Sequence, residues 1–247
     1  MDGIYTKPYQ VPMHCCDRFA RLRPSALLGE LQEIAGAHAT ALGVGDDTLA
    51  DRHLAWIVAR HNIEINRMPV FDQQILLKTW PGKTSKVAYP RYCVGLSQEG
   101  EIMFRSATVW LLLDLQQRTM VLPGRGGVAF TGEDRDNQLA LPGSLIPKEM
   151  TNQVTRCVRY SQLDVNDHMN NAKYFDWMED LLPAEFHKDH PLRAVQINYL
   201  NEAREGQEVQ LNYRLDANGT LLVDARRDGE NPARIFAAKA VYGQEAG

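Results

Sequence analysis

The sequence predicts an α+β fold made of two copies of one unit, each with one long helix packed on an antiparallel sheet. Three observations support this prediction. Each half contains one stretch with the apolar spacing of a helix, preceded by a strand-like alternation. Four or more further strand-like runs follow that stretch in each half. A segment rich in glycine, proline and charged residues separates the two halves, as a linker does.

In the first half, residues 9–13 alternate between apolar and polar side chains, as in a strand. Residues 25–42 then place apolar side chains at helical spacing over about five turns, and Gly43 would end this helix. The strand-like runs that follow cover residues 56–60, 63–65, 74–80, 87–96, 102–113 and 119–122.

The second half repeats this order. A strand is expected over residues 154–160, and a buried helix face follows at Tyr174, Trp177, Met178, Leu181 and Leu182. Strand-like runs then cover residues 195–199, 208–215, 220–226 and 235–242. We therefore expect a first repeat over residues 1–125, a linker over 126–152 and a second repeat over 153–247.

Composition excludes several classes of function. The net charge of −4 gives no general attraction to nucleic acid or to an anionic membrane. No run approaches the roughly 20 apolar residues of a membrane span, and the first ten residues lack an apolar signal core. The four cysteines form no C-x-x-C pair, so a reducing, cytoplasmic location is expected: Cys15, Cys16, Cys93 and Cys157.

A polar stretch precedes the second predicted helix. In an extended segment Asp164, Asn166 and His168 would share one face, beside the unpaired N–H groups of the helix start. Such a site could activate a nucleophile and stabilise an oxyanion. The alternative is a turn and a helix cap, which is the more common use of a series of Asx residues.

The first repeat helps to separate these alternatives. Aligning Ala26 with Ala172 places Arg18, Ala20 and Leu22 opposite the three polar residues, so the first copy would lack the polar set. A set required by the fold should occur twice, and this difference favours function. Glu202, at a strand end, faces Met68 when "VQINYLNEAREGQEV" is compared with "HNIEINRMPVFDQQI" of the first half, although an isolated acid in a loop is often only solvated. No P-loop, G-x-G-x-x-G or G-x-S-x-G motif is present, and no metal site is predicted.

The stretch "SQLDVNDHMNNAKYFDWMED" resembles the DxNxHxNNxKY segment of the acyl-acyl-carrier-protein thioesterases. "LAWIVARHNIEINRMPVFDQQILLKTWPG" and "SATVWLLLDLQQRTMVLP" also resemble segments of that family. The resemblance implies a tandem hot-dog fold and hydrolysis of the thioester of fatty acyl-acyl carrier protein. It assigns catalytic roles to Asp164, Asn166, His168 and, in "YLNEA", Glu202. Ala203 stands where the family has a cysteine, which disfavours a thiol nucleophile.

On this basis we expect attack by water, with Glu202 or Asp164 as the general base and no metal or organic cofactor. Amide groups near Asn170 and Asn171 would contact the substrate, and Leu28 and Leu31 of the first repeat would line an acyl tunnel. An acyl-CoA thioesterase, a 3-hydroxyacyl dehydratase and a non-catalytic acyl-chain binder stay open as alternatives, as do monomer and homodimer. Candidate docking residues for the carrier protein are Arg156, Arg159, Lys173, Arg193 and Arg204.

Overall fold

The computed structural model describes residues 3–128, 130–135, 138–229 and 232–243. The chain divides into two compact units, Met1–Leu22 with Leu27–Pro142 and Arg23–Ala26 with Gly143–Gly247. Each unit contains antiparallel strands, and in each unit they carry a helix whose buried face is mostly apolar.

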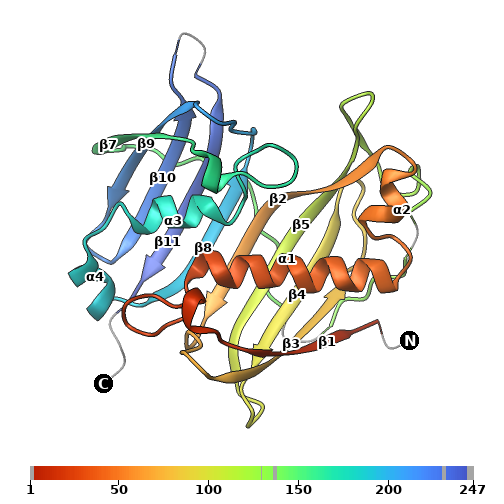
Figure 1. Cartoon of the computed structure of the whole chain (residues 1–247), viewed down its shortest axis with the longest axis horizontal. Helices are drawn as coiled ribbons and strands as arrows, with labels where there is room; N and C mark the ends of the chain where they lie inside the picture. Colours follow the sequence, from red (N-terminus) through yellow and green to blue (C-terminus); the bar gives the residue numbers. More distant parts are fainter. Residues whose placement is uncertain (1–2, 129, 136–137, 230–231, 244–247) are drawn as a thin grey trace. The chain divides into compact units, whose positions relative to one another are not determined.

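The first unit is a helix on a curved antiparallel sheet. In sequence order its elements are β1 (Tyr5–Gln10), η1 (Met13–Cys15), α1 (Pro24–Ala41), α2 (Asp46–Ala50), β2 (Leu54–Ile65), β3 (Gln74–Pro81), β4 (Tyr89–Leu96), β5 (Ile102–Asp114) and β6 (Thr119–Val121). The sheet order is β1-β3-β4-β5-β2, and β6 pairs with β5. In Figure 1 the orange helix α1 runs across one face of this sheet.

Three details of the first unit differ from the sequence prediction. The two runs expected over 56–60 and 63–65 form one strand, β2, with a register shift between Val58 and Arg60. Met13 lies in a 3-10 turn and not in the first strand, because the chain leaves the sheet after Gln10. The short helix α2 was not predicted.

The second unit has the same plan with a shorter helix. Its elements are β7 (Asn152–Cys157), η2 (Tyr160–Gln162), α3 (Lys173–Glu179), α4 (Ala184–Asp189), β8 (Leu192–Tyr199), β9 (Glu208–Leu215), β10 (Thr220–Arg227) and β11 (Arg234–Tyr242). The sheet order is β8-β11-β10-β9-β7. The strand expected over residues 154–160 is wrong at its end, since Tyr160 begins a 3-10 turn.

The expectation of a long second helix is also wrong. Helix α3 ends at Glu179 after seven residues. Pro183 precedes α4 and has an extended conformation, and a proline disfavours helical geometry in the residue before it. Leu182 is nevertheless buried, so the apolar pattern continues through the turn that separates α3 from α4.

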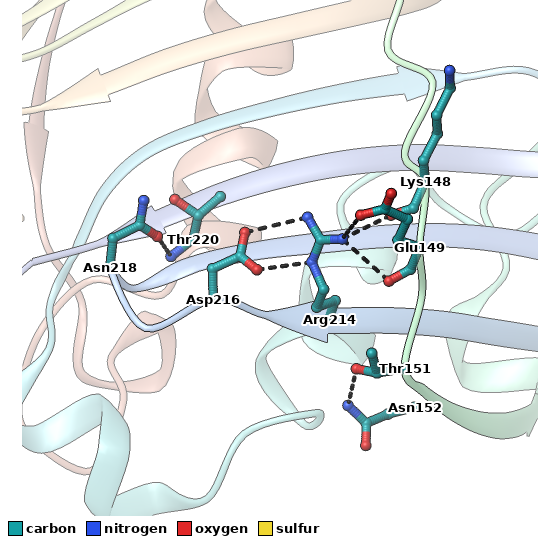
Figure 2. A network of polar contacts seen from close by, with 8 residues as sticks. All are labelled: Lys148, Glu149, Thr151, Asn152, Arg214, Asp216, Asn218 and Thr220. Atoms are coloured by element: carbon teal, nitrogen blue, oxygen red, sulfur yellow. Dashed lines mark hydrogen bonds and ion pairs between the residues drawn. The ribbon is translucent and has the colours of Figure 1, made fainter.

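The segment between β6 and β7 is attached to the protein at both ends. Val128 is buried with Leu54, and the ring of Phe130 lies 5.7 Å from that of Tyr89, so the first part packs on the first unit. Figure 2 shows the other end, where Arg214 Nη1 donates to the carbonyl oxygens of Lys148 and Glu149, each at 3.2 Å. This guanidinium also pairs with Asp216 at 2.8 Å through Nε.

The two units repeat the same hydrogen bonds outside their strands. Val11 N donates to Gln73 O at 3.0 Å, and Val158 N donates to Gln207 O at the same distance. Gln73 Oε1 also accepts from Val70 N at 3.2 Å. Its counterpart, the side chain of Gln207, accepts from Arg204 N at 3.0 Å. Matching bonds at matching positions confirm the internal duplication and provide an alignment that does not depend on side-chain identity.

Candidate active site

The polar stretch of the second unit forms a tight turn and not an extended segment. Asp164 N donates to His168 O at 2.8 Å, and Leu163 and Met169 form an antiparallel bridge just outside this pair. Asp167 has a φ of 62°, which closes the turn in the left-handed region. The expected alternation of three side chains along a strand face is therefore wrong.

The side chain of Asp164 belongs to this turn. Its Oδ1 accepts a hydrogen bond from Asn166 N at 2.8 Å, and its carbonyl oxygen accepts from Asp167 N at 3.1 Å. This is an Asx turn, a frequent structural use of aspartate. The contact also fixes the backbone of Asn166, whose own side chain is exposed.

The first unit contains the same turn. Asp17 N donates to Arg21 O at 2.8 Å, and Asp17 Oδ1 accepts from Phe19 N at 2.8 Å. Ala20 has a φ of 61°, matching the left-handed residue of the second turn. The alignment made from the sequence is thus wrong by one residue.

The corrected alignment changes the comparison of the repeats. Asp17 stands opposite Asp164, so the first repeat does contain this carboxylate. Phe19 and Arg21 stand opposite Asn166 and His168. The aspartate is accordingly a shared feature of the fold, whereas the amide and the imidazole occur in the second repeat alone.

The imidazole of His168 meets a carboxylate. His168 Nε2 lies 2.9 Å from Glu202 Oε2, with the side chains 23% and 50% exposed. One backbone bond brings them together, since Met169 N donates to Ala203 O at 2.8 Å and joins the residues that follow each of them.

The equivalent backbone bond in the first unit runs from Leu22 N to Pro69 O at 2.7 Å. It places Met68 opposite Glu202, as the sequence alignment predicted. Arg21, the counterpart of His168, instead pairs with Asp17 through Nε at 3.2 Å. The first repeat therefore has the scaffold of the site without its acid–base pair.

Cationic groups surround Glu202. Arg204 Nη2 lies 3.8 Å from Glu202 Oε2, and Arg227 Nη2 donates to the carbonyl oxygen of Glu202 at 3.4 Å. Arg227 lies on β10, far along the chain, and no signal in the sequence pointed to it.

Burial raises the pKa of Tyr174, and the nearby Asp164 and Glu202 carboxylates raise it further. This phenol therefore stays protonated beside the site.

The two asparagines expected to contact substrate have structural contacts. Asn170 Oδ1 accepts from Ala172 N at 2.8 Å, and Asn170 O accepts from Lys173 N at 2.9 Å. The carbonyl oxygen of Asn171 accepts from the Tyr199 hydroxyl at 3.1 Å. The backbone N–H groups of Ala172 and Lys173, which could have bound an oxyanion, are therefore already bonded to Asn170.

The remaining predicted residues lie elsewhere. Leu28 and Leu31 are core residues of α1 in the first unit, with exposed fractions of 0% and 4%. Within the described ranges, no three His, Cys, Asp or Glu side chains are grouped as metal ligands. The four cysteines are free thiols. In the part of the chain that the structure describes, no helix has both the length and the apolarity needed to cross a membrane.

Two family models match this chain. The acyl-ACP thioesterase N-terminal domain matches residues 2–122, and the C-terminal domain of the same family matches residues 147–237. The chain belongs to the acyl-ACP thioesterase family. The paired turns and the His168–Glu202 contact thus lie within the two family domains.

Plant acyl-acyl carrier protein thioesterases are among the relatives of this chain. The chain is 27% identical to a chloroplastic palmitoyl-acyl carrier protein thioesterase of Gossypium hirsutum, over 74% of this chain and 48% of that protein. It is 24% identical to the chloroplastic oleoyl-acyl carrier protein thioesterase 1 of Arabidopsis thaliana, over 72% of this chain and 55% of that protein. The chain spans about half the length of the curated relatives it matches.

Solved structures confirm the tandem hot-dog fold. An acyl-ACP thioesterase from Bacteroides thetaiotaomicron gives a TM-score of 0.89 at 22% identity, covering 98% of both chains. The 12:0-ACP thioesterase from Umbellularia californica gives 0.83 at 17% identity, covering 99% of both chains. At these identities the likeness establishes the fold.

Proposed function

We propose that this protein hydrolyses the thioester of fatty acyl-acyl carrier protein and releases the free fatty acid. The observation that carries the proposal is the 2.9 Å contact between His168 Nε2 and Glu202 in the second repeat. A carboxylate held against one imidazole nitrogen fixes the tautomer and leaves the other nitrogen able to accept a proton. Family membership supplies the substrate class.

In the proposed mechanism, the Glu202 carboxylate accepts a hydrogen bond from His168 Nε2–H and so orients the imidazole. His168 Nδ1 then acts as the general base. Water attacks the thioester carbonyl carbon while its proton moves to Nδ1. The tetrahedral intermediate then expels the phosphopantetheine sulfur, which takes that proton from the imidazolium as the C–S bond breaks. The products are the fatty acid and the free thiol of the carrier, and no cofactor takes part.

The exposed amide of Asn166 is the proposed donor to the carbonyl oxygen. Asp164 acts as a positioning residue, because its Oδ1 holds the backbone of Asn166 at 2.8 Å. This assignment differs from the expectation that Asp164 is a base, since Asp17 performs the same contact in the first repeat, which lacks the imidazole. The helix cap is not the oxyanion site in this scheme.

We further propose that the acyl chain occupies the first repeat, against the apolar face of α1 that includes Leu28 and Leu31. A role in fatty acid biosynthesis and a cytoplasmic location complete the proposal, in keeping with four cysteines that are free thiols. Monomer and homodimer are both compatible with it.

A turnover panel tests the proposed function. Purified protein is assayed with acyl chains of several lengths on acyl carrier protein and on coenzyme A, and with 3-hydroxyacyl-acyl carrier protein for elimination of water. We expect hydrolysis on the carrier protein, and a loss of roughly 10²–10⁴-fold in kcat for His168→Ala. Preference for coenzyme A, water elimination, or tight binding without turnover would each replace the proposal with the corresponding alternative.

A further inference from the structure

A row of polar side chains crosses the buried face of the first unit's sheet. His61 on β2 is in register with Thr108 on β5, which is in register with Arg91 on β4. Their exposed fractions are 1%, 5% and 9%. Thr108 Oγ1 lies 2.9 Å from His61 Nδ1, so these two members of the row are hydrogen-bonded to each other in the interior.

Helix α1 covers this row, and its His38 contacts it. Arg91 Nη1 donates to His38 Nδ1 at 3.0 Å and to Thr79 Oγ1 at 3.4 Å. Since a guanidinium can only donate, His38 Nδ1 is the acceptor and this imidazole is neutral. Burial, and then the charge of Arg91, lowers the pKa of His38 to about 4, in agreement with that state.

The charge of Arg91 lacks a counterion. Burial lowers its pKa to about 10, so the guanidinium stays charged at neutral pH. Among the described residues no carboxylate pairs with it, and only Nη1 has hydrogen-bond partners. A buried cation without an anionic partner is strongly unfavourable. The Nε and Nη2 groups of the Arg91 guanidinium are suited to donate hydrogen bonds to an oxygen atom of a ligand.

His61 supplies a second unsatisfied polar group. Its Nε2 is buried and has no hydrogen-bond partner in the part of the chain that the structure describes. Burial lowers the pKa of His61 to about 3, so the ring is neutral. Buried polar atoms in native proteins nearly always have partners, and an exception calls for a physical explanation.

The second repeat shows that the fold does not require this polarity. In the first repeat, the backbone N–H groups of Asn66 and Arg67 both donate to Met103 O. In the second repeat, those of Leu200 and Asn201 both donate to Ile235 O. This equivalence aligns β2 with β8. Counting back along both strands, the second-repeat row that corresponds to His61, Thr108 and Arg91 consists of Val195, Ala240 and Leu221. These three residues are buried and apolar.

We propose that Arg91, His38 and His61 bind an oxygen substituent on the acyl chain, so that the substrate class includes oxygenated fatty acyl thioesters. This inference rests on the proposed function and on an acyl chain within the first repeat. A hydroxyl, keto or carboxylate oxygen would accept from the free donors of Arg91, and a hydroxyl or carboxylic acid could also donate to a bare imidazole nitrogen. A plain hydrocarbon would leave both groups unsatisfied, so the row should favour the oxygenated chain.

The test compares matched substrates on the full chain. Plain acyl-acyl carrier protein is assayed beside chains of equal length that carry a hydroxyl at successive carbons or a terminal carboxylate, which separates the two sources of oxygen. The wild type should show a higher kcat/KM for at least one oxygenated chain than for its plain partner. The ratio of these two kcat/KM values should fall about tenfold or more in Arg91→Leu, the loss of one charge-assisted hydrogen bond.

The second repeat provides variants whose side chains suit this position of the fold. Arg91→Leu and His61→Val copy Leu221 and Val195, and Ser106→Ala, which copies Ala238 in the neighbouring row, is the matched control. Each variant is first shown to be folded by circular dichroism, and His61→Val carries the test if Arg91→Leu does not fold. A plain-chain preference at every length, or an unchanged ratio in the folded variants, overturns the inference.

A direct binding measurement separates this inference from the proposed function. If no thioester is hydrolysed, the proposed function fails, and calorimetry with free hydroxy, dicarboxylic and plain fatty acids then decides. Tighter binding of an oxygenated acid that is lost in Arg91→Leu supports the site. Equal binding of plain and oxygenated acids, or no binding of any, refutes it.

Discussion

Replacement of Asp164 separates a positioning role from a catalytic one, because the first repeat contains a matched aspartate. In Asp164→Asn the side chain keeps an oxygen that can accept from Asn166 N, the contact observed at 2.8 Å. The variant loses the negative charge and all ability to accept a proton as a base. We therefore expect kcat within about tenfold of the wild type, whereas removal of a general base costs roughly 10²–10⁴-fold.

Asp164→Ala removes the acceptor and should act on both stability and rate. One hydrogen bond at a partly exposed turn contributes about 0.5–1.5 kcal/mol, and that is the expected loss in the free energy of unfolding. The rate should fall further than in Asp164→Asn, because the backbone of Asn166 is no longer held. Asn166→Ala should lower kcat without this loss of stability.

Asp17→Ala is the control in the first repeat. Asp17 Oδ1 accepts from Phe19 N and from Arg21 N, so the stability loss should equal or exceed that of Asp164→Ala. Because no imidazole follows this turn, kcat should stay near that of the wild type at temperatures where the protein is folded. Urea denaturation and single-turnover hydrolysis of acyl-acyl carrier protein provide the two measurements.

A fall of a hundredfold or more in Asp164→Asn, in protein with wild-type stability, would refute the positioning role. It would restore Asp164 as a candidate base and transfer the orienting role to His168. A fall in kcat of similar size in Asp17→Ala would show instead that turn geometry anywhere in the chain limits the rate.

Three further predictions concern pH, docking and chain length. His38 and His61 have pKa values lowered to about 4 and about 3. In the unfolded chain these histidines have pKa values near 6.5. Between pH 6.5 and the lowered pKa values, the unfolded chain binds more protons than the folded protein. The free energy of unfolding should therefore fall as pH drops below about 6.5, by about 2 kcal/mol per histidine at pH 5. Melting curves of wild type and His61→Val check this, and equal pH slopes in the two proteins would contradict it. Enlarging Leu28 or Leu31 to Trp should shorten the preferred acyl chain and cost about 1–3 kcal/mol by overpacking. A chain-length profile of relative kcat/KM that keeps its shape while all rates fall would place the chain elsewhere. Neutralising several basic residues together should raise KM for acyl carrier protein substrates, more at low salt than at high salt, and an unchanged KM at low salt would exclude docking through this set: Arg156, Arg159, Lys173, Arg193 and Arg204.

Much of the fold was predictable because apolar periodicity is a local property of the chain. The spacing of residues 25–42 predicted α1, and alternation along the later runs predicted most strands of both sheets. The shortened second helix could also have been predicted, since Pro183 stands in the sequence beside the pattern that it interrupts. The polar set before α3, together with Glu202 facing Met68, was enough to locate the candidate site.

The roles within that site depend on contacts between distant segments. The alignment of Asp164 with Asp17 rests on backbone hydrogen bonds and left-handed residues, neither of which can be read from the sequence. His168 meets Glu202 only because Met169 N bonds to Ala203 O, a pairing between segments far apart in the chain. Sequence spacing alone could not choose among several acids as its partner.

The buried polar row is the clearest product of tertiary structure. His61, Thr108 and Arg91 lie on three strands, and each by itself is an ordinary polar residue in an alternating run. Only the register of the sheet places them side by side under α1, and only burial leaves His61 Nε2 without a hydrogen-bond partner. The sequence by itself determined which segments form strands and helices, because apolar spacing acts over a few residues. The tertiary structure decided which polar groups share a dry interior, because burial and register arise only when those strands pair.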